Sequence, residues 1–125
     1  MSLFNWNPKG FKLHSGDMSP FLIDCSVLTD EDWQALARMV YEKLGERHFR
    51  KVVGVPMGGL KLARELIPFR FPNPEYPILI VDDVLTTGRS MEEGRAELGE
   101  DCIGTVVFVR GDCPDWITPL WAGKP

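Results

Sequence analysis

Apolar residues in this chain follow two patterns, one with the period of a helix and one continuous. Between Thr29 and Gly45 they recur at helical spacing, at Trp33, Leu36, Ala37, Val40 and Leu44. Thr29 to Asp32 resembles a capping box, and Gly45 is a typical helix end. Continuous apolar runs predict buried strands at 51–55, 78–81 and 103–109, and further helices are predicted at 59–66 and 89–98.

The alternation of these strands and helices predicts an α/β fold. Three such strands imply a parallel sheet with right-handed crossovers, whose ligands bind at the carboxyl ends of the strands. The segments 56–59 and 82–90 both fall at such ends. Two short strands are also predicted between Phe11 and Asp24, and a chain of 125 residues is expected to form one domain.

Residues Ile78 to Met91 carry the most specific pattern. The sequence ILIVDDVLTTGRSM predicts a buried strand that ends in a hydroxyl-rich, glycine-containing turn and opens a helix. Unpaired amides at a helix N-terminus favour an anion, so 86–90 can hold a phosphomonoester. Asp82 and Asp83 would repel that phosphate unless they face hydroxyl donors or a metal, and a ribose diol supplies such donors. The alternative is an ordinary turn with solvated acids.

This segment resembles the phosphoribosyl pyrophosphate (PRPP) motif of type I phosphoribosyltransferases. The resemblance implies a Rossmann-like parallel sheet flanked by helices, with a small hood. It also implies that Asp82 and Asp83 hold the ribose hydroxyls and are the catalytic acids. The 5-phosphate would lie in the loop that follows, at Thr86, Thr87, Gly88, Arg89 and Ser90.

Two other segments are similar to the orotate branch of that family. Residues 11–16 and 19–24 resemble its N-terminal hood, which implies that Lys12, His14, Phe21 and Leu22 contact the base. Residues 52–59 resemble its pyrophosphate loop, here Pro56, Met57, Gly58 and Gly59, which in the family often contains a non-proline cis peptide bond. Many orotate enzymes have a lysine at the place of Gly58, and Lys61 is the nearest substitute. A plain strand-to-helix turn is the alternative for this loop.

The chain departs from the family between the second helix and the second strand. The family inserts a mobile basic lid there, whereas residues 67–77 form only a proline-rich turn, so the lid is expected to be missing. Lys61, Arg64 and Arg70 are the basic candidates to replace it; the alternative is that each is a solvated surface charge, which is the favoured interpretation for Arg70. The tail at 110–121 resembles the carboxyl-terminal hood of some purine phosphoribosyltransferases, which implies that this tail stacks on the base. The favoured alternative is that Trp116 and Trp121 pack on the sheet or at a dimer interface.

Composition and charge limit the classes of molecule that the chain is expected to bind. A net charge of −4 and a pI near 5.1 argue against a nucleic-acid binder, which usually has a basic face. No apolar run approaches the ~20 residues of a membrane span. The first ten residues do not read as a signal peptide, and the three cysteines are widely spaced, so a reduced, cytoplasmic protein is expected.

The resemblance and the charge together imply the expected function. PRPP is a polyanion, so an acidic protein is expected to bind it with Mg²⁺ held mainly by substrate and water. The expected activity is transfer of the phosphoribosyl group to a pyrimidine base, orotate being the best match, by a homodimer. One domain would combine a hood at about 1–28 and 111–125 with a core at about 29–110. The alternatives are a non-catalytic PRPP- or nucleotide-binding module and a purine phosphoribosyltransferase.

Overall fold

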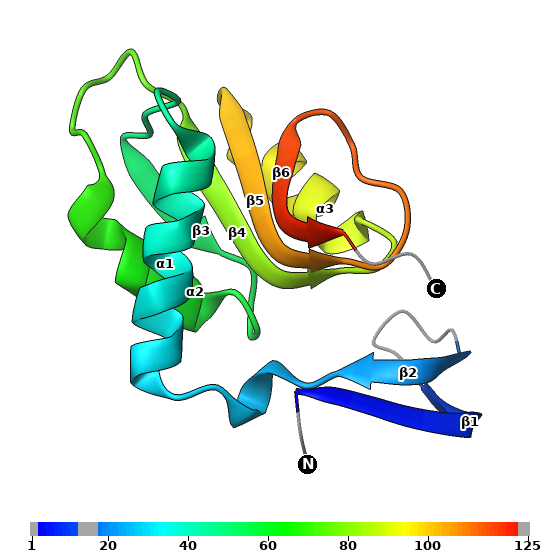
Figure 1. Ribbon diagram of the computed structural model, residues 1–125. Helices are drawn as coiled ribbons and strands as arrows, with labels where there is room; N and C mark the ends of the chain where they lie inside the picture. Colours follow the sequence, from blue (N-terminus) through cyan, green and yellow to red (C-terminus); the bar gives the residue numbers. More distant parts are fainter. Residues whose placement is uncertain (1–2, 13–17, 123–125) are drawn as a thin grey trace.

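Four parallel strands form the main sheet of the computed structural model, which describes residues 3–12 and 18–122 (Figure 1). Their order is β3-β4-β5-β6, with bounds Lys51–Gly54, Ile78–Leu85, Cys102–Val109 and Ile117–Ala122. The predicted α/β class and parallel sheet are confirmed. The prediction of three strands was wrong, because the tail adds β6 beside β5. β6 contains Pro119, which lacks an amide hydrogen and is tolerated here because β6 is an edge strand.

The three helices cover the two faces of this sheet unequally. α1 (Asp30–Leu44) and α2 (Leu60–Leu66) lie on one face, and α3 (Arg89–Leu98) lies on the other (Figure 1). The predicted capping box is present: the Asp32 amide donates to Thr29 Oγ1 (3.2 Å) and the Thr29 amide to Asp32 Oδ2 (2.9 Å). α1 ends at Gly45, whose φ of 62° places it in the left-handed half of the map.

The core has one hydrophobic cluster on each face of the sheet. The predicted stripe of α1 packs with α2 and with Leu79 and Val81 of β4. Met91 of α3 packs with Ile78 and Ile80 of the same strand. Successive residues of β4 therefore point to opposite faces, and both faces are buried, as is usual for a parallel sheet.

A separate antiparallel hairpin precedes the core. β1 (Phe4–Lys12) pairs with β2 (Met18–Ile23), and the Asp24 amide donates to Leu3 O at the open end (2.6 Å). Strand β1 begins earlier than predicted, at Phe4 rather than near Phe11. A short 3₁₀ turn, Cys25–Val27, then leads to α1. Figure 1 shows the hairpin on the side of the sheet toward which the arrowheads of β5 and β6 point. In the described part of the chain, no helix has the length and apolarity to cross a membrane.

Candidate functional site

The acid pair lies inside β4 rather than after it. The strand continues from Val81 through Leu85, and Asp82 is opposite Val106 of β5. Both aspartates are half-buried, unlike the solvated acids of the alternative interpretation. The Asp83 amide donates to Asp82 Oδ1 (2.8 Å), and the Val84 amide donates to Asp83 Oδ1 (2.7 Å). Each carboxylate is thus oriented by the backbone of the next residue.

Among the described residues, no basic side chain forms an ion pair with either carboxylate. Across residues 3–12 and 18–122, the ion pairs involve only arginines and acids elsewhere in the chain. Burial raises the pKa of Asp82 to about 8, and a hydrogen bond with Asp83 and repulsion by its charge act in the same direction. The ionised form of this acid pair is therefore unfavourable without a ligand. A ligand that brings hydroxyl donors or positive charge would stabilise the ionised form.

The raised pKa of Asp82 predicts that the protein loses stability as pH rises. The folded-state pKa of about 8 lies above the ordinary value of 3.8. Between about pH 4 and 8 the folded chain therefore holds a proton that the unfolded chain releases. The contribution of this group is present below that window and is lost across it, by at most about 1.4 kcal/mol per pH unit. Urea denaturation at a series of pH values should show this slope, and Asp82→Asn should flatten it. Equal slopes in wild type and Asp82→Asn would contradict the assignment, with exposed Asp101→Asn as the control.

The predicted phosphate loop follows β4 directly. Gly88, with a φ of 82°, forms the N-cap of α3, and the Arg89 amide donates to Thr87 Oγ1 (3.3 Å). Ser90 is exposed, and its amide has no hydrogen-bond partner among the described residues. Thr86 and Thr87 supply hydroxyls at the same turn. The loop therefore offers the amides and hydroxyls that an anion at a helix N-terminus needs.

The predicted pyrophosphate loop meets the acid pair. The peptide bond between Pro56 and Met57 is cis, as the resemblance implied. A Cβ added to Gly58 would lie 2.5 Å from Asp83 Oδ1, so the backbone of this loop is packed against the carboxylate. The Val55 amide donates to Val81 O (2.9 Å), which fixes the start of the loop on β4. The two loops that the sequence placed at strand ends are brought together at Asp83.

The predicted base hood falls where the structure describes little. Lys12 lies in β1, and Phe21 and Leu22 lie in β2, but their side chains are outside the described part. His14 lies outside the described residues altogether. Their contacts with a base stay predictions.

The shortened segment 67–77 is held at the end of the sheet where the strands begin, opposite the end where they finish. The Phe71 amide donates to Phe49 O (2.8 Å), and the Arg50 amide, just before β3, donates to Pro77 O (3.0 Å). The His48 ring packs against Phe71 and Tyr76, with centroid distances of 4.3 and 5.2 Å. A segment held there does not cover the acid pair. The expectation that the usual lid is missing agrees with this arrangement.

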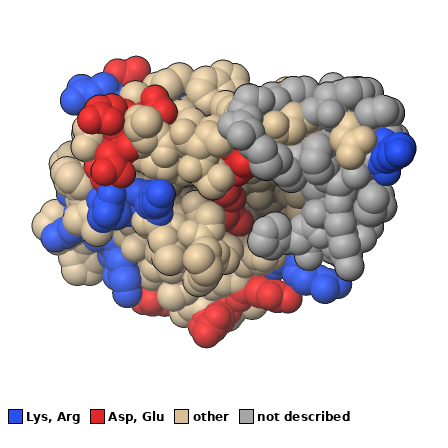
Figure 2. Space-filling view, turned by 90° about the horizontal axis from the view of Figure 1, so that it is seen from below, with Lys and Arg blue, Asp and Glu red and all other residues tan. Residues whose placement is uncertain are grey.

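Of the three basic candidates, only Lys61 is near the pyrophosphate loop, in the first turn of α2. Arg70 is exposed and belongs to the segment held where the strands begin, which agrees with the favoured interpretation of Arg70 as a surface charge. Arg64 lies within 3.3 Å of Glu65 and 3.8 Å of Asp30. The described part of the face in Figure 2 carries Lys and Arg in separate groups beside Asp and Glu, and no basic stripe crosses it.

Sequence reasoning missed Arg110. This residue follows β5, and its amide donates to Leu85 O (3.0 Å), immediately before the phosphate loop. It is half-buried, and burial lowers the pKa of its guanidinium. The available signal was its place as the first charged residue after a buried strand next to β4.

The two tail tryptophans have different environments. Trp116 Nε1 donates to Glu92 Oε1 of α3 (2.7 Å), and Arg95 lies 4.8 Å above the Trp116 ring. The ring also packs over Gly104 of β5. The favoured interpretation, packing on the sheet, is therefore confirmed for Trp116. Trp121 is 42% exposed and stacks on Phe108 with a centroid distance of 5.4 Å.

The acid pair could bind the predicted Mg²⁺ only together with substrate, because the protein supplies too few ligands by itself. Within the described ranges, no group of three or more His, Cys, Asp or Glu side chains could hold a metal. Two carboxylates without a cation are hard oxygen donors of the kind that Mg²⁺ accepts, but they are too few to enclose it. The residues thus fit an ion whose remaining ligands are substrate oxygens and water.

Solved structures that share this fold include phosphoribosyltransferases. Orotate phosphoribosyltransferase from Aeropyrum pernix matches with a TM-score of 0.69 and 25% identity, over 87% of this chain and 76% of that one. UMP synthase from Leishmania donovani matches with a TM-score of 0.69 and 19% identity, over 86% of this chain but 29% of that one. Purine phosphoribosyltransferase from Pyrococcus horikoshii Ot3 matches with a TM-score of 0.52 and 19% identity, over 78% and 93%.

The sequence comparisons are less informative than the structural ones. No protein-family model and no curated protein sequence matches the chain. The resemblance to type I phosphoribosyltransferases is therefore confirmed through the fold, with orotate enzymes prominent among the similar structures. Because a purine enzyme also shares the fold, the fold does not choose the base.

Proposed function

We propose that this chain is a phosphoribosyltransferase that transfers the phosphoribosyl group of PRPP to a nucleobase, with orotate as the first candidate acceptor, and releases pyrophosphate. The contact between Gly58 and Asp83 carries the proposal, because it joins a pyrophosphate loop to a ribose-binding acid pair. In this assignment Asp82 and Asp83 accept hydrogen bonds from the ribose hydroxyls. The 5-phosphate lies in the loop from Thr86 to Ser90, and the pyrophosphate lies at 56–59.

The proposed reaction follows from the charges at this site. The bond between the anomeric carbon and a pyrophosphate oxygen breaks, and its electron pair leaves with pyrophosphate. A ring nitrogen of the base supplies the pair for the new bond, and the proton on that nitrogen passes to water. Positive charge develops on the sugar, and the negative charge that Asp82 and Asp83 carry between them stabilises it electrostatically. Mg²⁺, held by substrate oxygens and water beside these acids, would neutralise the leaving group.

Arg110 supports orotate as the acceptor. Orotate carries a carboxylate, and a guanidinium forms bidentate hydrogen bonds with such a group. The Arg110 amide is bonded to Leu85 O, so this residue begins beside the phosphate loop. The hood positions Lys12, His14, Phe21 and Leu22 would close over the base from the other side. A hood at about 1–28 and 111–125 over a core at about 29–110 stays part of this proposal.

A non-catalytic PRPP- or nucleotide-binding module is the second candidate. The fixed segment 67–77 favours it, because a lid that excludes water is what turnover needs and binding does not. A purine acceptor would also suit the fold. A turnover assay with a panel of pyrimidine and purine bases separates these possibilities, since a binding module would release no pyrophosphate with any base.

We also propose that the chain forms a homodimer and works in the cytoplasm. Met57 and Leu60, near the pyrophosphate loop, are exposed apolar residues, which suits a homodimer interface there. Cys25, Cys102 and Cys113 are free thiols, which suits the reducing cytoplasm.

PRPP with Mg²⁺ should bind and raise the melting temperature. A ligand that binds only the native state raises the free energy of unfolding by about 2.7 kcal/mol when its concentration is a hundred times its Kd. Calorimetric titration and thermal melts would measure this, and no heat at millimolar PRPP would remove the proposed function. The pair Asp82→Asn and Asp83→Asn should abolish binding while circular dichroism stays unchanged. The pair Asp101→Asn and Asp115→Asn, which removes two exposed charges, should still bind.

A further inference from the structure

The connection between β5 and β6 is hydrogen-bonded to the helix that follows the phosphate loop. It passes along α3 (Figure 1), and Trp116 near its end donates from Nε1 to Glu92 Oε1 (2.7 Å). Glu92 lies in the first turn of α3, where its amide donates to Gly88 O (3.0 Å). Trp116 is therefore bonded to the helical turn that would hold the 5-phosphate.

Close packing fixes the Trp116 ring in this position. A Cβ added to Gly104 of β5 would lie 2.8 Å from the ring and 3.0 Å from Met91 Cε, so strand, ring and helix are in tight contact there. The Arg95 guanidinium lies 4.8 Å from the ring centroid. The Gly104 amide donates to Trp116 O (2.9 Å), which fixes the backbone as well. The indole N–H thus has little freedom to turn away from Glu92.

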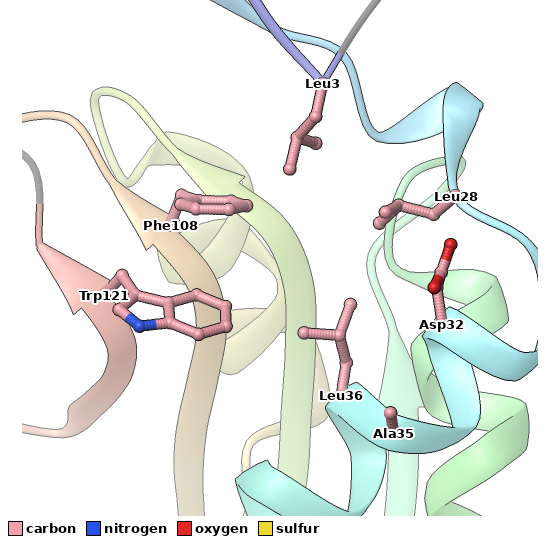
Figure 3. Close-up of a pocket in the computed structure, with 7 residues that line it drawn as sticks. All are labelled: Leu3, Leu28, Asp32, Ala35, Leu36, Phe108 and Trp121. Carbon is pink, nitrogen blue, oxygen red and sulfur yellow. The ribbon is translucent and has the colours of Figure 1, made fainter.

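The other tryptophan of the tail faces the opposite side of the sheet. Trp121 lines an apolar pocket of about 530 Å³ beside α1, together with Phe108 and Leu36 (Figure 3). Phe108 packs with the hydrophobic cluster on the α1 face, whereas Trp116 packs with the cluster on the α3 face. Trp116 is therefore the tail tryptophan that can act on α3.

Glu92 is an unfavourable neighbour for a bound phosphate. Helical side chains lean toward the N-terminus of their helix, so a free Glu92 carboxylate would turn toward the phosphate loop. A carboxylate is itself favoured at a helix N-terminus, where it would compete for the unpaired amides and repel a second anion. Gly88 caps α3 without a side-chain hydrogen bond, which leaves those amides open. In the structure the carboxylate is held by Trp116 instead.

We propose that Trp116 is a positioning residue for the 5-phosphate, because its indole N–H holds the Glu92 carboxylate on the flank of α3 and away from the loop at 86–90. The proposal rests on the proposed function and adds a residue to its phosphate site. The ligand that benefits is a sugar phosphomonoester, whose dianion then meets amides and hydroxyls without a competing carboxylate. Trp116 acts through Glu92 and does not bind the phosphate itself.

The test measures the Kd of ribose 5-phosphate by calorimetric titration in a double-mutant cycle. Trp116→Phe keeps an aromatic ring over Gly104 but removes the N–H, so the Glu92 carboxylate is released. Affinity should fall roughly threefold, the size of a single-charge effect at an exposed helix N-terminus. Glu92→Gln keeps an acceptor for Trp116 and removes the charge, so it should bind at least as tightly as wild type. The double variant should bind like Glu92→Gln, because no carboxylate is left to release.

Glu92→Asp tests the hydrogen bond without a change at Trp116. The shorter side chain keeps the charge but cannot reach the indole, so this variant should bind as weakly as Trp116→Phe, and thermal melts report the fold of both. Repulsion between exposed charges is screened by salt, so both deficits should shrink toward wild type at about 1 M salt. Glu97→Gln removes an exposed acid from the last turn of α3 and should leave the Kd at the wild-type value.

A merely structural role for Trp116 predicts a different result, in which Trp116→Phe weakens binding equally with and without Glu92→Gln. That result, or wild-type affinity in both Trp116→Phe and Glu92→Asp, would overturn the proposal and leave the proposed function standing. If wild type binds neither ribose 5-phosphate nor PRPP with Mg²⁺, the proposed function itself fails and the positioning role fails with it.

Discussion

Gly58→Ala should weaken PRPP binding markedly with the fold largely retained. The added methyl group would meet the Asp83 carboxylate, with Cγ and Oδ1 both at 2.5 Å from the new Cβ. Asp83 cannot turn away freely, because its Oδ1 accepts the Val84 amide (2.7 Å). Relief of the overlap must therefore separate the pyrophosphate loop from the acid pair. Overpacking of this kind costs about 1–3 kcal/mol, and PRPP affinity should fall roughly tenfold or more.

The control for this substitution is Gly111→Ala. Gly111 is exposed, and a Cβ there meets nothing within 4 Å. Its melting temperature and PRPP affinity should match those of wild type. If Gly58→Ala binds PRPP as tightly as Gly111→Ala, the loop at 56–59 does not cooperate with Asp83, and the pyrophosphate assignment is wrong.

The sequence predicted most of the core because its signals are local. The apolar runs, the capping box at Thr29 and the glycine at 45 each act over a few residues, and each is found in the structure. The cis peptide bond at Pro56 was implied by resemblance and is also present. Where neighbouring residues determine the outcome, a pattern in the sequence is sufficient.

The features that the sequence did not predict depend on distant partners. β6 was missed because Pro119 disfavours a strand, and only its place at the sheet edge makes it tolerable. β4 was predicted to end before Asp82, because two consecutive acids are typical of a loop. In the structure the strand continues because β5 pairs with it beyond that point. The contact of Gly58 with Asp83 and the half-buried place of Arg110 likewise follow from strand order, which periodicity does not encode.

The position of the shortened segment 67–77 also depends on distant partners, so the sequence did not predict it. Its length showed that the usual lid was missing, but not where the remaining residues lie. The hydrogen bonds at Phe49 and Pro77 and the stacking on His48 hold it at the edge where the strands begin. The segment is therefore held away from Asp82 and Asp83, and within residues 3–12 and 18–122 the hairpin and the end of β6 are the candidates to cover the sugar.

Turnover should therefore be slow and accompanied by hydrolysis. Without a basic lid, water should compete with the base for the activated sugar, and the leaving pyrophosphate loses electrostatic stabilisation worth roughly 3 kcal/mol or more. Pyrophosphate release measured without a base should be appreciable beside nucleotide formation with orotate. Transfer at an ordinary rate, on the order of 10 per second, with negligible release in the absence of base, would contradict this expectation. In that case, if the end of β6 closes the site, Trp121→Ala should raise the release of pyrophosphate without a base. Trp116→Ala should not raise it, because Trp116 is hydrogen-bonded to Glu92 on the face covered by α3.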